Sequence, residues 1–242
     1  PKRPECKSGK TYLCGAGIVF LLLIHLRKAL RKIDFWTDSQ GEPNLKQYCD
    51  LVALGTIADV SPLVGENRIF VKAGLTILND SPRAGIKALI EQNCNGDSID
   101  ATAAAFRVIP VLNAAGRMQH AGRAFDLLAA KDDAAAQSLT RELLKLNRKR
   151  QQLEQETMQR VLDVFENNPA MLRKKALVVA GKDWHEGILG ILASRLVEKY
   201  GKPVLVLSER ESTLKGSGRT PGWLDLFKCL NDCAQYLTNF GG

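Results

Sequence analysis

Residues suited to phosphate chemistry gather near the end of the chain. The segment Lys215-Gly216-Ser217-Gly218-Arg219-Thr220 combines two glycines, two hydroxyl groups and two cations. Glycine lets a backbone approach an anion closely, while hydroxyl groups and cations bind phosphate oxygens. The segment is therefore interpreted as a phosphate-handling site, with Lys215, Ser217 and Arg219 as its binding side chains. A polar hairpin uses the same residue types, so the neighbouring segments must decide between the two interpretations.

The preceding segment predicts a strand, a helix and a second strand. Residues 176–180 are apolar, residues 187–200 are amphipathic and residues 203–208 are apolar again, which indicates a parallel βαβ unit. The loop at 183–187 then lies at the carboxyl end of a strand and at the start of a helix. Proteins with open α/β sheets bind ligands and anions at such places.

Two side chains of this loop have more than one interpretation. His185 is a candidate to hydrogen-bond a phosphate or a metal-bound oxygen, although capping the helix is the ordinary role of such a histidine. Trp184 is suited to stacking on a base and equally to packing in a core.

Further candidate side chains lie in the first half of the chain. Asp59 follows a mostly apolar stretch, as a strand-end or loop ligand for a hard divalent cation would. One carboxylate does not make a metal site. Between residues 106 and 118, Arg107, Asn113 and Arg117 supply two guanidinium groups and an amide among small residues, and arginine forks suit phosphates.

Helical periodicity dominates the region that must position these residues. Apolar faces predict helices over 16–31, 45–54, 67–80 and 85–93. Residues from 132 to 167 carry spaced leucines without glycine or proline and predict one long helix. Its alternating charges are typical of a solvated helix that connects two domains. Its basic band at 146–151 would face either a nucleic-acid channel or water.

Composition narrows the class of protein. The 242 residues are 45% hydrophobic and 25% charged, which is typical of a globular soluble protein. Nothing in them resembles a secretory leader or a span of about twenty apolar residues, so no membrane partner is expected. The formal charge of +8 favours an anionic partner such as nucleic acid. Six cysteines without zinc-type spacing indicate reduced thiols and a cytoplasmic location.

Taken together, these motifs resemble the RecJ family of single-strand-specific 5′→3′ exonucleases, in the DHH phosphoesterase superfamily. The resemblance covers nearly the whole chain. It is specific because several separated motifs occur in the family's order: the last metal-site motif of the catalytic DHH domain (50–60), the segment after it (113–117), the connecting helix (146–151), the DHH-associated domain (184–187 and 193–195) and its nucleic-acid loop (216–219).

The resemblance implies an α/β fold in three parts. Residues 1–80 would be the C-terminal part of a DHH domain, residues 81–168 a connector with the long helix, and residues 169–242 a truncated DHH-associated nucleic-acid-binding domain. The family's earlier aspartate motifs and its Asp-His-His triplet do not occur in the sequence. The chain is therefore expected to be a fragment that lacks most of the metal site and the C-terminal end, and to be inactive alone. Val111 stands where many relatives carry arginine.

The resemblance also implies a function for the parent protein. Such a protein hydrolyses single-stranded DNA from the 5′ end to 5′ mononucleotides in DNA repair and recombination, using two Mn²⁺ or Mg²⁺ ions. Asp59 carries over as a catalytic residue and metal ligand. Single-stranded DNA is the expected partner, with a repair helicase and a single-strand-binding protein as further candidates. The side chains expected to hold the strand are Arg107, Asn113, Arg117, His185, Lys215, Ser217 and Arg219.

Two other functions stay open. A DHH phosphoesterase of short oligonucleotides or cyclic dinucleotides is one, although the long connector and the segment at 113–117 favour the RecJ type. A non-catalytic nucleic-acid or replication-partner binding protein is the other, and in it Asp59 would be a relic.

Overall fold

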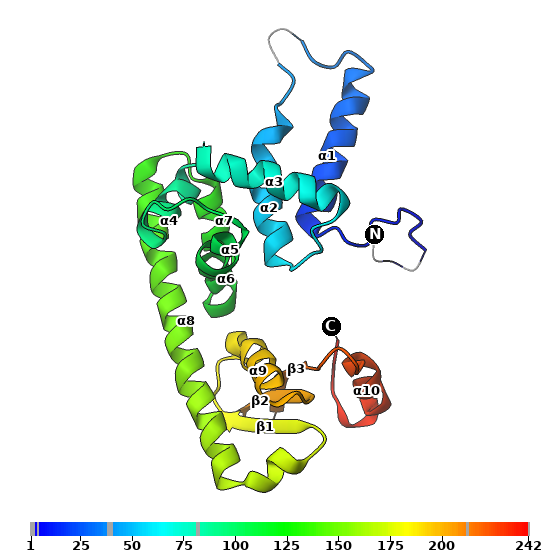
Figure 1. Cartoon of the computed structure of the whole chain (residues 1–242), viewed down its shortest axis with the longest axis vertical. Coiled ribbons are helices and arrows are strands. Elements are labelled where there is room, and N and C mark those ends of the chain that lie inside the picture. The colour runs from blue at the N-terminus through cyan, green and yellow to red at the C-terminus, as the bar shows by residue number, and fades with distance from the viewer. Residues whose placement is uncertain (1–2, 4, 38–40, 81–82, 212, 242) are drawn as a thin grey trace. The chain divides into compact units, whose positions relative to one another are not determined.

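A computed structural model describes residues 3, 5–37, 41–80, 83–211 and 213–241 (Figure 1). Two elements, α6 (Ile109–Met118) and α8 (Asp133–Asn167), each contribute residues to both of the compact units into which the contacts divide the chain. The three-part division expected from the sequence stays a prediction. Unit 1 comprises Pro1–Ala115 and Ala121–Leu144, and unit 2 comprises Gly116–His120 and Lys145–Gly242.

In its described residues, unit 1 is built from helices, and the helices expected over 16–31, 67–80 and 85–93 are confirmed with small shifts at their ends. The segment expected as a helix over 45–54 differs, because it begins as a 3₁₀ turn and its α-helix continues beyond Gly55. The elements are α1 (Gly15–Arg31), the 3₁₀ turn η1 (Leu45–Tyr48), α2 (Cys49–Ala58), α3 (Gly65–Asp80), α4 (Ala84–Asn93), α5 (Ala101–Ala103), the π-helical turn η2 (Ala104–Val108), α7 (Gly122–Ala129) and the unit 1 parts of α6 and α8.

Close packing joins α2 to α3. A side chain at Gly74 of α3 would lie 2.2 Å from the Cys49 carbonyl oxygen and 2.4 Å from Ala53 Cβ, so only glycine permits this approach. The buried carboxylate of Asp50 accepts two hydrogen bonds from Arg83, at 2.7 and 3.0 Å. Asp50 is therefore a structural residue of the motif at 50–60.

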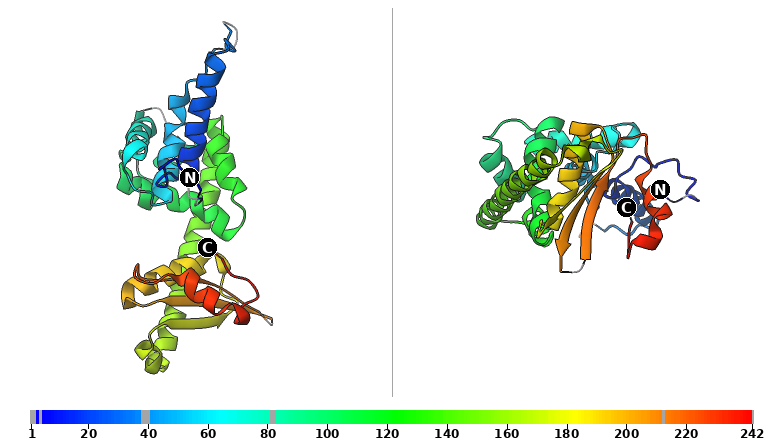
Figure 2. Two further views of the ribbon diagram at one scale, coloured as in Figure 1. Left: turned by 90° about the vertical axis from the view of Figure 1, so that its right-hand side faces the viewer. Right: turned by 90° about the horizontal axis from the view of Figure 1, so that it is seen from below.

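Unit 2 holds a three-stranded sheet in the order β1-β2-β3, in which β1 (Leu177–Lys182) is parallel to β2 (Val204–Arg210) and β3 (Thr213–Arg219) is antiparallel to β2. Helix α9 (Glu186–Tyr200) connects β1 to β2 and packs on β2 and β3 (Figure 2). The predicted βαβ unit is confirmed. Besides its parts of α6 and α8, the described residues of unit 2 also form the 3₁₀ turns η3 (Pro169–Arg173) and η4 (Ala234–Tyr236), and helix α10 (Leu226–Asp232).

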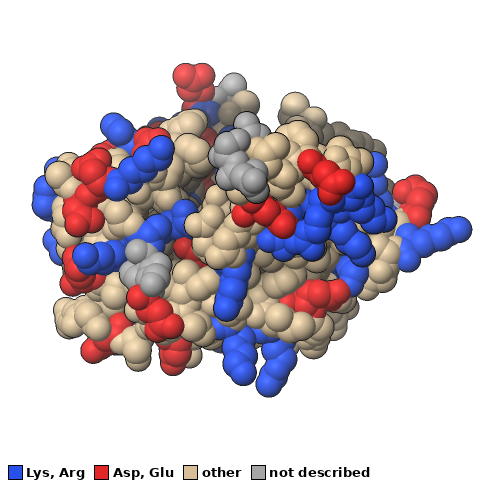
Figure 3. Space-filling model, turned by 90° about the horizontal axis from the view of Figure 1, so that it is seen from above, with Lys and Arg blue, Asp and Glu red and all other residues tan. Residues whose placement is uncertain are grey.

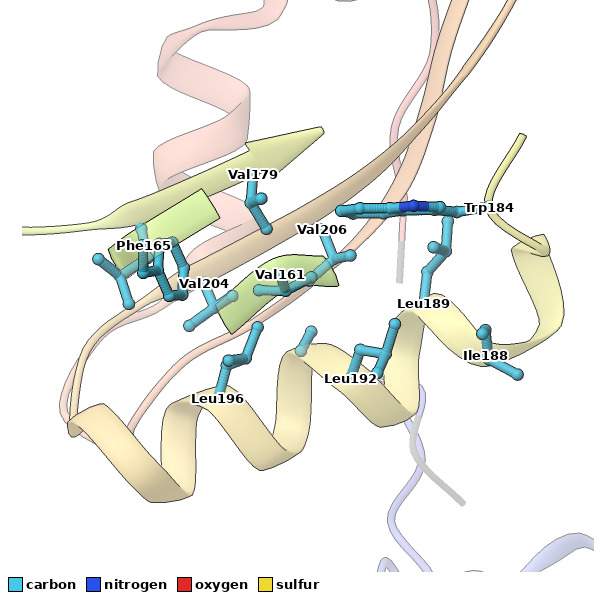
Figure 4. Packing of buried hydrophobic residues seen from close by; sticks show 12 residues of the cluster. Val161, Phe165, Val179, Trp184, Ile188, Leu189, Leu192, Leu196, Val204 and Val206 are labelled. Atoms are coloured by element: carbon cyan, nitrogen blue, oxygen red, sulfur yellow. The ribbon is translucent and has the colours of Figure 1, made fainter. Parts of the chain in front are cut away.

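The core of unit 2 lies between the sheet and α9 and is shown in Figure 4. Alternate residues of β1 and β2 are buried, because successive side chains of a strand point to opposite faces and one face carries α9. Val161 and Phe165 of α8 join the same cluster. Trp184 is 4% exposed and packs there as well, so the core interpretation of this tryptophan is confirmed and the base-stacking interpretation is wrong.

The segment at 216–219, expected as a nucleic-acid loop, is instead part of strand β3. Its glycines make room for neighbours within the fold. A side chain at Gly216 would lie 2.3 Å from Leu207 Cδ2, and one at Gly218 would lie 2.6 Å from Leu226 Cδ2. Tertiary packing therefore overrides the turn preference of glycine.

Helix α8 confirms the long helix expected over 132–167. Its basic band is divided between two environments, since Arg148 and Lys149 are exposed while Arg150 is largely buried. The surface of the molecule carries both signs of charge, and on the face drawn in Figure 3 lysine and arginine side chains gather in one area. Within the described residues, no helix has the length and apolar character needed to cross a membrane.

The contact at Gly74 generates a stability prediction. Gly74→Ala should lower the free energy of unfolding by about 1–3 kcal/mol, because the added methyl group overpacks the α2–α3 contact. Gly15→Ala is the matched control, since nothing lies within 4 Å of a side chain there. Chemical denaturation measures both variants, and equal stabilities would contradict the close packing.

A second prediction concerns Glu66 of α3, which accepts hydrogen bonds from Lys10 and Tyr12. These bonds lower the pKa of Glu66 from 4.5 to about 2, and the bond from Lys10 has the larger effect. The carboxylate therefore stabilises the fold above pH 4.5, and this contribution is lost as the pH falls towards 2.

Glu66→Gln should lower the melting temperature near neutral pH, and the gap to the parent protein should narrow as the pH is lowered through this window. The exposed Glu5 provides the control Glu5→Gln. A gap that is independent of pH would count against the assigned ion pair.

Candidate nucleic-acid interface

Strand β3 presents three polar side chains on one face of the sheet. Lys215, Ser217 and Arg219 alternate with the two glycines, so they share the face that α9 covers. A side chain at Gly190 of α9 would lie 3.2 Å from Ser217 Oγ and 3.3 Å from Arg219 Nη2. The lack of a side chain at Gly190 therefore lets both polar groups lie directly against the helix.

The guanidinium group of Arg219 is held by its own strand. Its Nη1 donates to the Gly218 carbonyl oxygen at 2.7 Å and to Ser217 Oγ at 3.2 Å. The residue is nevertheless exposed, and its planar fork has further donors besides Nη1. The arrangement fixes the direction of the cation before any ligand binds.

His185 caps the N-terminus of α9. Its Nδ1 accepts a hydrogen bond from the Gly187 amide at 3.1 Å, which confirms the capping interpretation. In the neutral ring the proton then resides on Nε2, which becomes a donor. Capping and hydrogen bonding to a phosphate are therefore compatible at this residue, because they use different nitrogens.

The end of α6 lies against the start of α9. A side chain at Gly187 would lie 1.9 Å from the Arg117 carbonyl oxygen, and Arg117 Nη1 donates to the Gly187 carbonyl at 3.3 Å. Beside this contact is a hollow of about 480 Å³, whose lining includes Arg117, His185, Glu186 and Arg210. Two arginines and a histidine in one hollow favour an anionic ligand.

Glu186, at the first position of α9, is the acidic side chain of this group. Its Oε2 lies 2.6 Å from Lys215 Nζ, and its Oε1 lies 3.6 Å from Arg210 Nη1. The hydrogen bond from Lys215 is the main cause that lowers the pKa of Glu186. The carboxylate is therefore ionised at neutral pH and neutralises part of the positive charge around it.

A buried carboxylate fixes two further arginines in unit 2. Glu154 of α8 is 1% exposed, and its oxygens lie 2.9 Å from Arg150 Nη1 and 2.6 Å from Arg195 Nη2 of α9. Arg150 Nε also donates to Asn147 Oδ1, and burial lowers the pKa of Arg150. This network explains the sequence motif at 146–151 as a connection between α8 and α9.

The other candidate residues belong to unit 1. Asp59 is the exposed C-cap residue of α2 and accepts a hydrogen bond from Ser61 Oγ at 3.0 Å. It therefore ends a helix, which corrects the expected strand end or loop. Arg107 forms an ion pair with Asp97 at 3.1 Å, and Asn113 is exposed on α6.

The residues present do not fit a two-metal site by themselves. No group of three histidine, cysteine, aspartate or glutamate side chains capable of holding a metal ion occurs in the part of the chain that the structure describes. Asp59 is thus a candidate ligand that would need partners beyond this chain's described residues to complete such a site.

The structure places five of the eight candidate residues in unit 2, namely Arg117, His185, Lys215, Ser217 and Arg219, whereas the sequence grouped Arg117 with Arg107 and Asn113. The sequence did not single out Glu186, although it lies within the motif at 184–187, or Arg210, which ends strand β2 outside any motif. Their only signal would have been charge pairing across the predicted βαβ unit.

Comparison with known proteins places these features in a family context. The model of the DHHA1 domain matches residues 173–242. The single-stranded-DNA-specific exonuclease RecJ of Bacillus subtilis is 35% identical over 100% of this chain, and that of Thermus thermophilus is 36% identical over 99%. The crystal structure of Thermus thermophilus RecJ in complex with Mn²⁺ matches 94% of the chain with a TM-score of 0.80 at 36% identity. A RecJ exonuclease bound to manganese matches 100% with a TM-score of 0.76 at 35% identity.

The chain spans only part of these proteins. It corresponds to 29% of the Bacillus subtilis protein, and to 32% and 56% of the two crystallised chains. The match nevertheless extends through both units and includes the α/β fold of unit 2. This chain is therefore homologous over its whole length to a segment of the RecJ proteins, and its residues 173–242 match the DHHA1 domain.

Proposed function

We propose that this chain is the nucleic-acid-binding part of a single-strand-specific 5′→3′ exonuclease. The whole protein would hydrolyse single-stranded DNA to 5′ mononucleotides in DNA repair and recombination, and this chain alone would bind DNA without cutting it. The support is the homology to RecJ exonucleases along the full chain, together with a set of phosphate-binding groups in unit 2.

One observation carries the binding proposal. Ser217 and Arg219 lie against α9 at Gly190, on the same face as Lys215, and the hollow near His185 contains Arg117 and Arg210. Hydroxyl, imidazole and guanidinium donors on rigid elements are the groups that hold a phosphodiester backbone. They read charge and geometry rather than base identity, as a nuclease without sequence preference requires.

Asp59 is proposed as the contribution of unit 1 to catalysis. A carboxylate at the C-terminus of a helix meets the negative end of the helix dipole, and a bound cation would relieve this unfavourable interaction. Mn²⁺ or Mg²⁺ is the proposed cofactor of the whole protein, where it would activate water and stabilise charge on the phosphodiester. Further ligands would have to come from outside the described residues.

Arg107 and Asn113 are proposed as additional strand contacts. Arg107 pairs with Asp97 in unit 1, so a phosphate would have to compete with that carboxylate. A repair helicase and a single-strand-binding protein as partners, and a cytoplasmic location, are proposed from the family resemblance and the free cysteines. The non-catalytic alternative keeps one specific support, which is that the described residues contain no group of three potential metal ligands.

The binding role of Arg219 leads to a quantitative prediction. Arg219→Ala should weaken binding of the chain to single-stranded DNA and reduce the slope of log affinity against log salt by about one, because one phosphate contact is lost. Fluorescence anisotropy with a labelled oligothymidylate at several salt concentrations measures both quantities.

Arg160→Ala is a matched control. Arg160 is exposed on α8, so this substitution removes the same charge at another place in unit 2. Equal slopes for the parent chain and Arg219→Ala would remove Arg219 from the interface.

The role of Asp59 is tested in a protein that carries this chain together with the remaining segments of its relatives. Asp59→Ala should abolish metal-dependent hydrolysis and leave DNA binding unchanged, because the variant loses a metal ligand and no DNA contact. The exposed Asp80 gives the control Asp80→Ala. Nuclease assays and binding isotherms on the same preparations check this, and retained hydrolysis would favour the non-catalytic function.

A further inference from the structure

Glu186 contacts two cations of unit 2. Its two carboxylate oxygens approach Lys215 Nζ at 2.6 Å and Arg210 Nη1 at 3.6 Å. Both cations belong to the candidate interface, and Glu186 is the acidic residue in the lining of the hollow. A carboxylate and a phosphate offer similar anionic oxygens, so the two compete for the same donors.

Stability alone gives little reason for this arrangement. The side chain of Lys215 is 74% exposed and that of Glu186 is 33% exposed, and exposed ion pairs add little to the stability of a fold. By contrast, the buried Glu154 already joins α9 to α8 through Arg150 and Arg195. Unit 2 therefore has an ionic connection between α8 and α9 that does not involve Glu186.

We infer that Glu186 is an internal competitor that holds Lys215 and Arg210 in the free protein and releases them when a nucleic-acid backbone binds. This inference rests on the proposed function, because it assumes that the interface takes phosphodiesters. A ligand must supply enough contacts at other donors to displace the carboxylate. Glu186 is thus a specificity-determining residue rather than a catalytic one.

The expected selectivity follows from the number of contacts. A strand with several phosphates engages Ser217 and Arg219 while it displaces Glu186 from Lys215. A single small anion such as inorganic phosphate gains too few contacts to offset the broken ion pair and the repulsion from the carboxylate. The residue therefore favours chains of phosphodiesters over isolated anions.

The test is a double-mutant cycle on the chain, read as binding of labelled oligothymidylate between about 50 and 200 mM salt. Glu186→Gln should tighten binding about threefold to tenfold, because Lys215 is freed. Lys215→Gln should weaken binding by the parent chain, because a phosphate contact is lost, and it should also cancel most of the gain of Glu186→Gln. Competition by inorganic phosphate should become stronger in Glu186→Gln.

A charge control separates contact from general electrostatics. Glu198→Gln removes the same charge from an exposed position on the same helix and should tighten binding much less. Circular dichroism and melting temperatures establish that all variants are folded.

The outcomes are distinguishable. Binding by the parent chain with equal gains from Glu186→Gln and Glu198→Gln overturns the competitor role and leaves the proposed function standing. Additive effects of Glu186→Gln and Lys215→Gln on the binding free energy also overturn the competitor role and leave the proposed function standing. No binding by any variant overturns the proposed function, and the inference with it. A gain in affinity that occurs only in Glu186→Gln and that requires Lys215 supports both the proposed function and the competitor role.

Discussion

The contact between α9 and β3 across Gly190 is the constraint on which the candidate interface depends. A helix normally lies far enough from a sheet for side chains to fill the space between them. At Gly190 that space holds Ser217 Oγ and the end of Arg219 instead. The same helix begins with His185 and Glu186, so its position fixes the distances among the donors and their internal competitor. Polar groups on a rigid helix and strand keep their geometry better than groups on a loop.

Rigidity of α9 in turn comes from two sources in unit 2. The apolar cluster that includes Leu189, Leu192 and Val206 fixes the helix against the sheet. The carboxylate of Glu154 adds an ionic connection to α8, since it lies near guanidinium groups from both helices. Apolar packing alone would permit small rotations of the helix, whereas a buried ion pair tolerates few arrangements. The charged network thus specifies the orientation that apolar burial stabilises.

Much of the fold could be predicted from the sequence, because periodicity reports burial directly. The leucines of α8 and the apolar runs around 177 and 204 identify their elements without help from the rest of the chain. The glycine-rich β3 could not be predicted in this way, since its strand conformation depends on pairing with β2 and on packing against Leu226. The pair Glu186–Lys215 was missed for a related reason, because only the tertiary fold brings the two together. The separate contributions of Asp59, Arg107 and Asn113 stay predictions from the family resemblance.

The alternation along β3 also limits how this region can change during evolution. Lys215, Ser217 and Arg219 reach α9 because each pairs with a fixed residue of β2, as Ser217 does with Val206. Inserting or deleting one residue in this strand would shift the register by one and turn the three polar side chains away from the helix. The glycines would then face α9, and their places against Leu205 and Leu207 would receive Ser217 and one of the two cations. Single-residue insertions and deletions within β3 are therefore incompatible with the interface, whereas point substitutions can adjust it gradually.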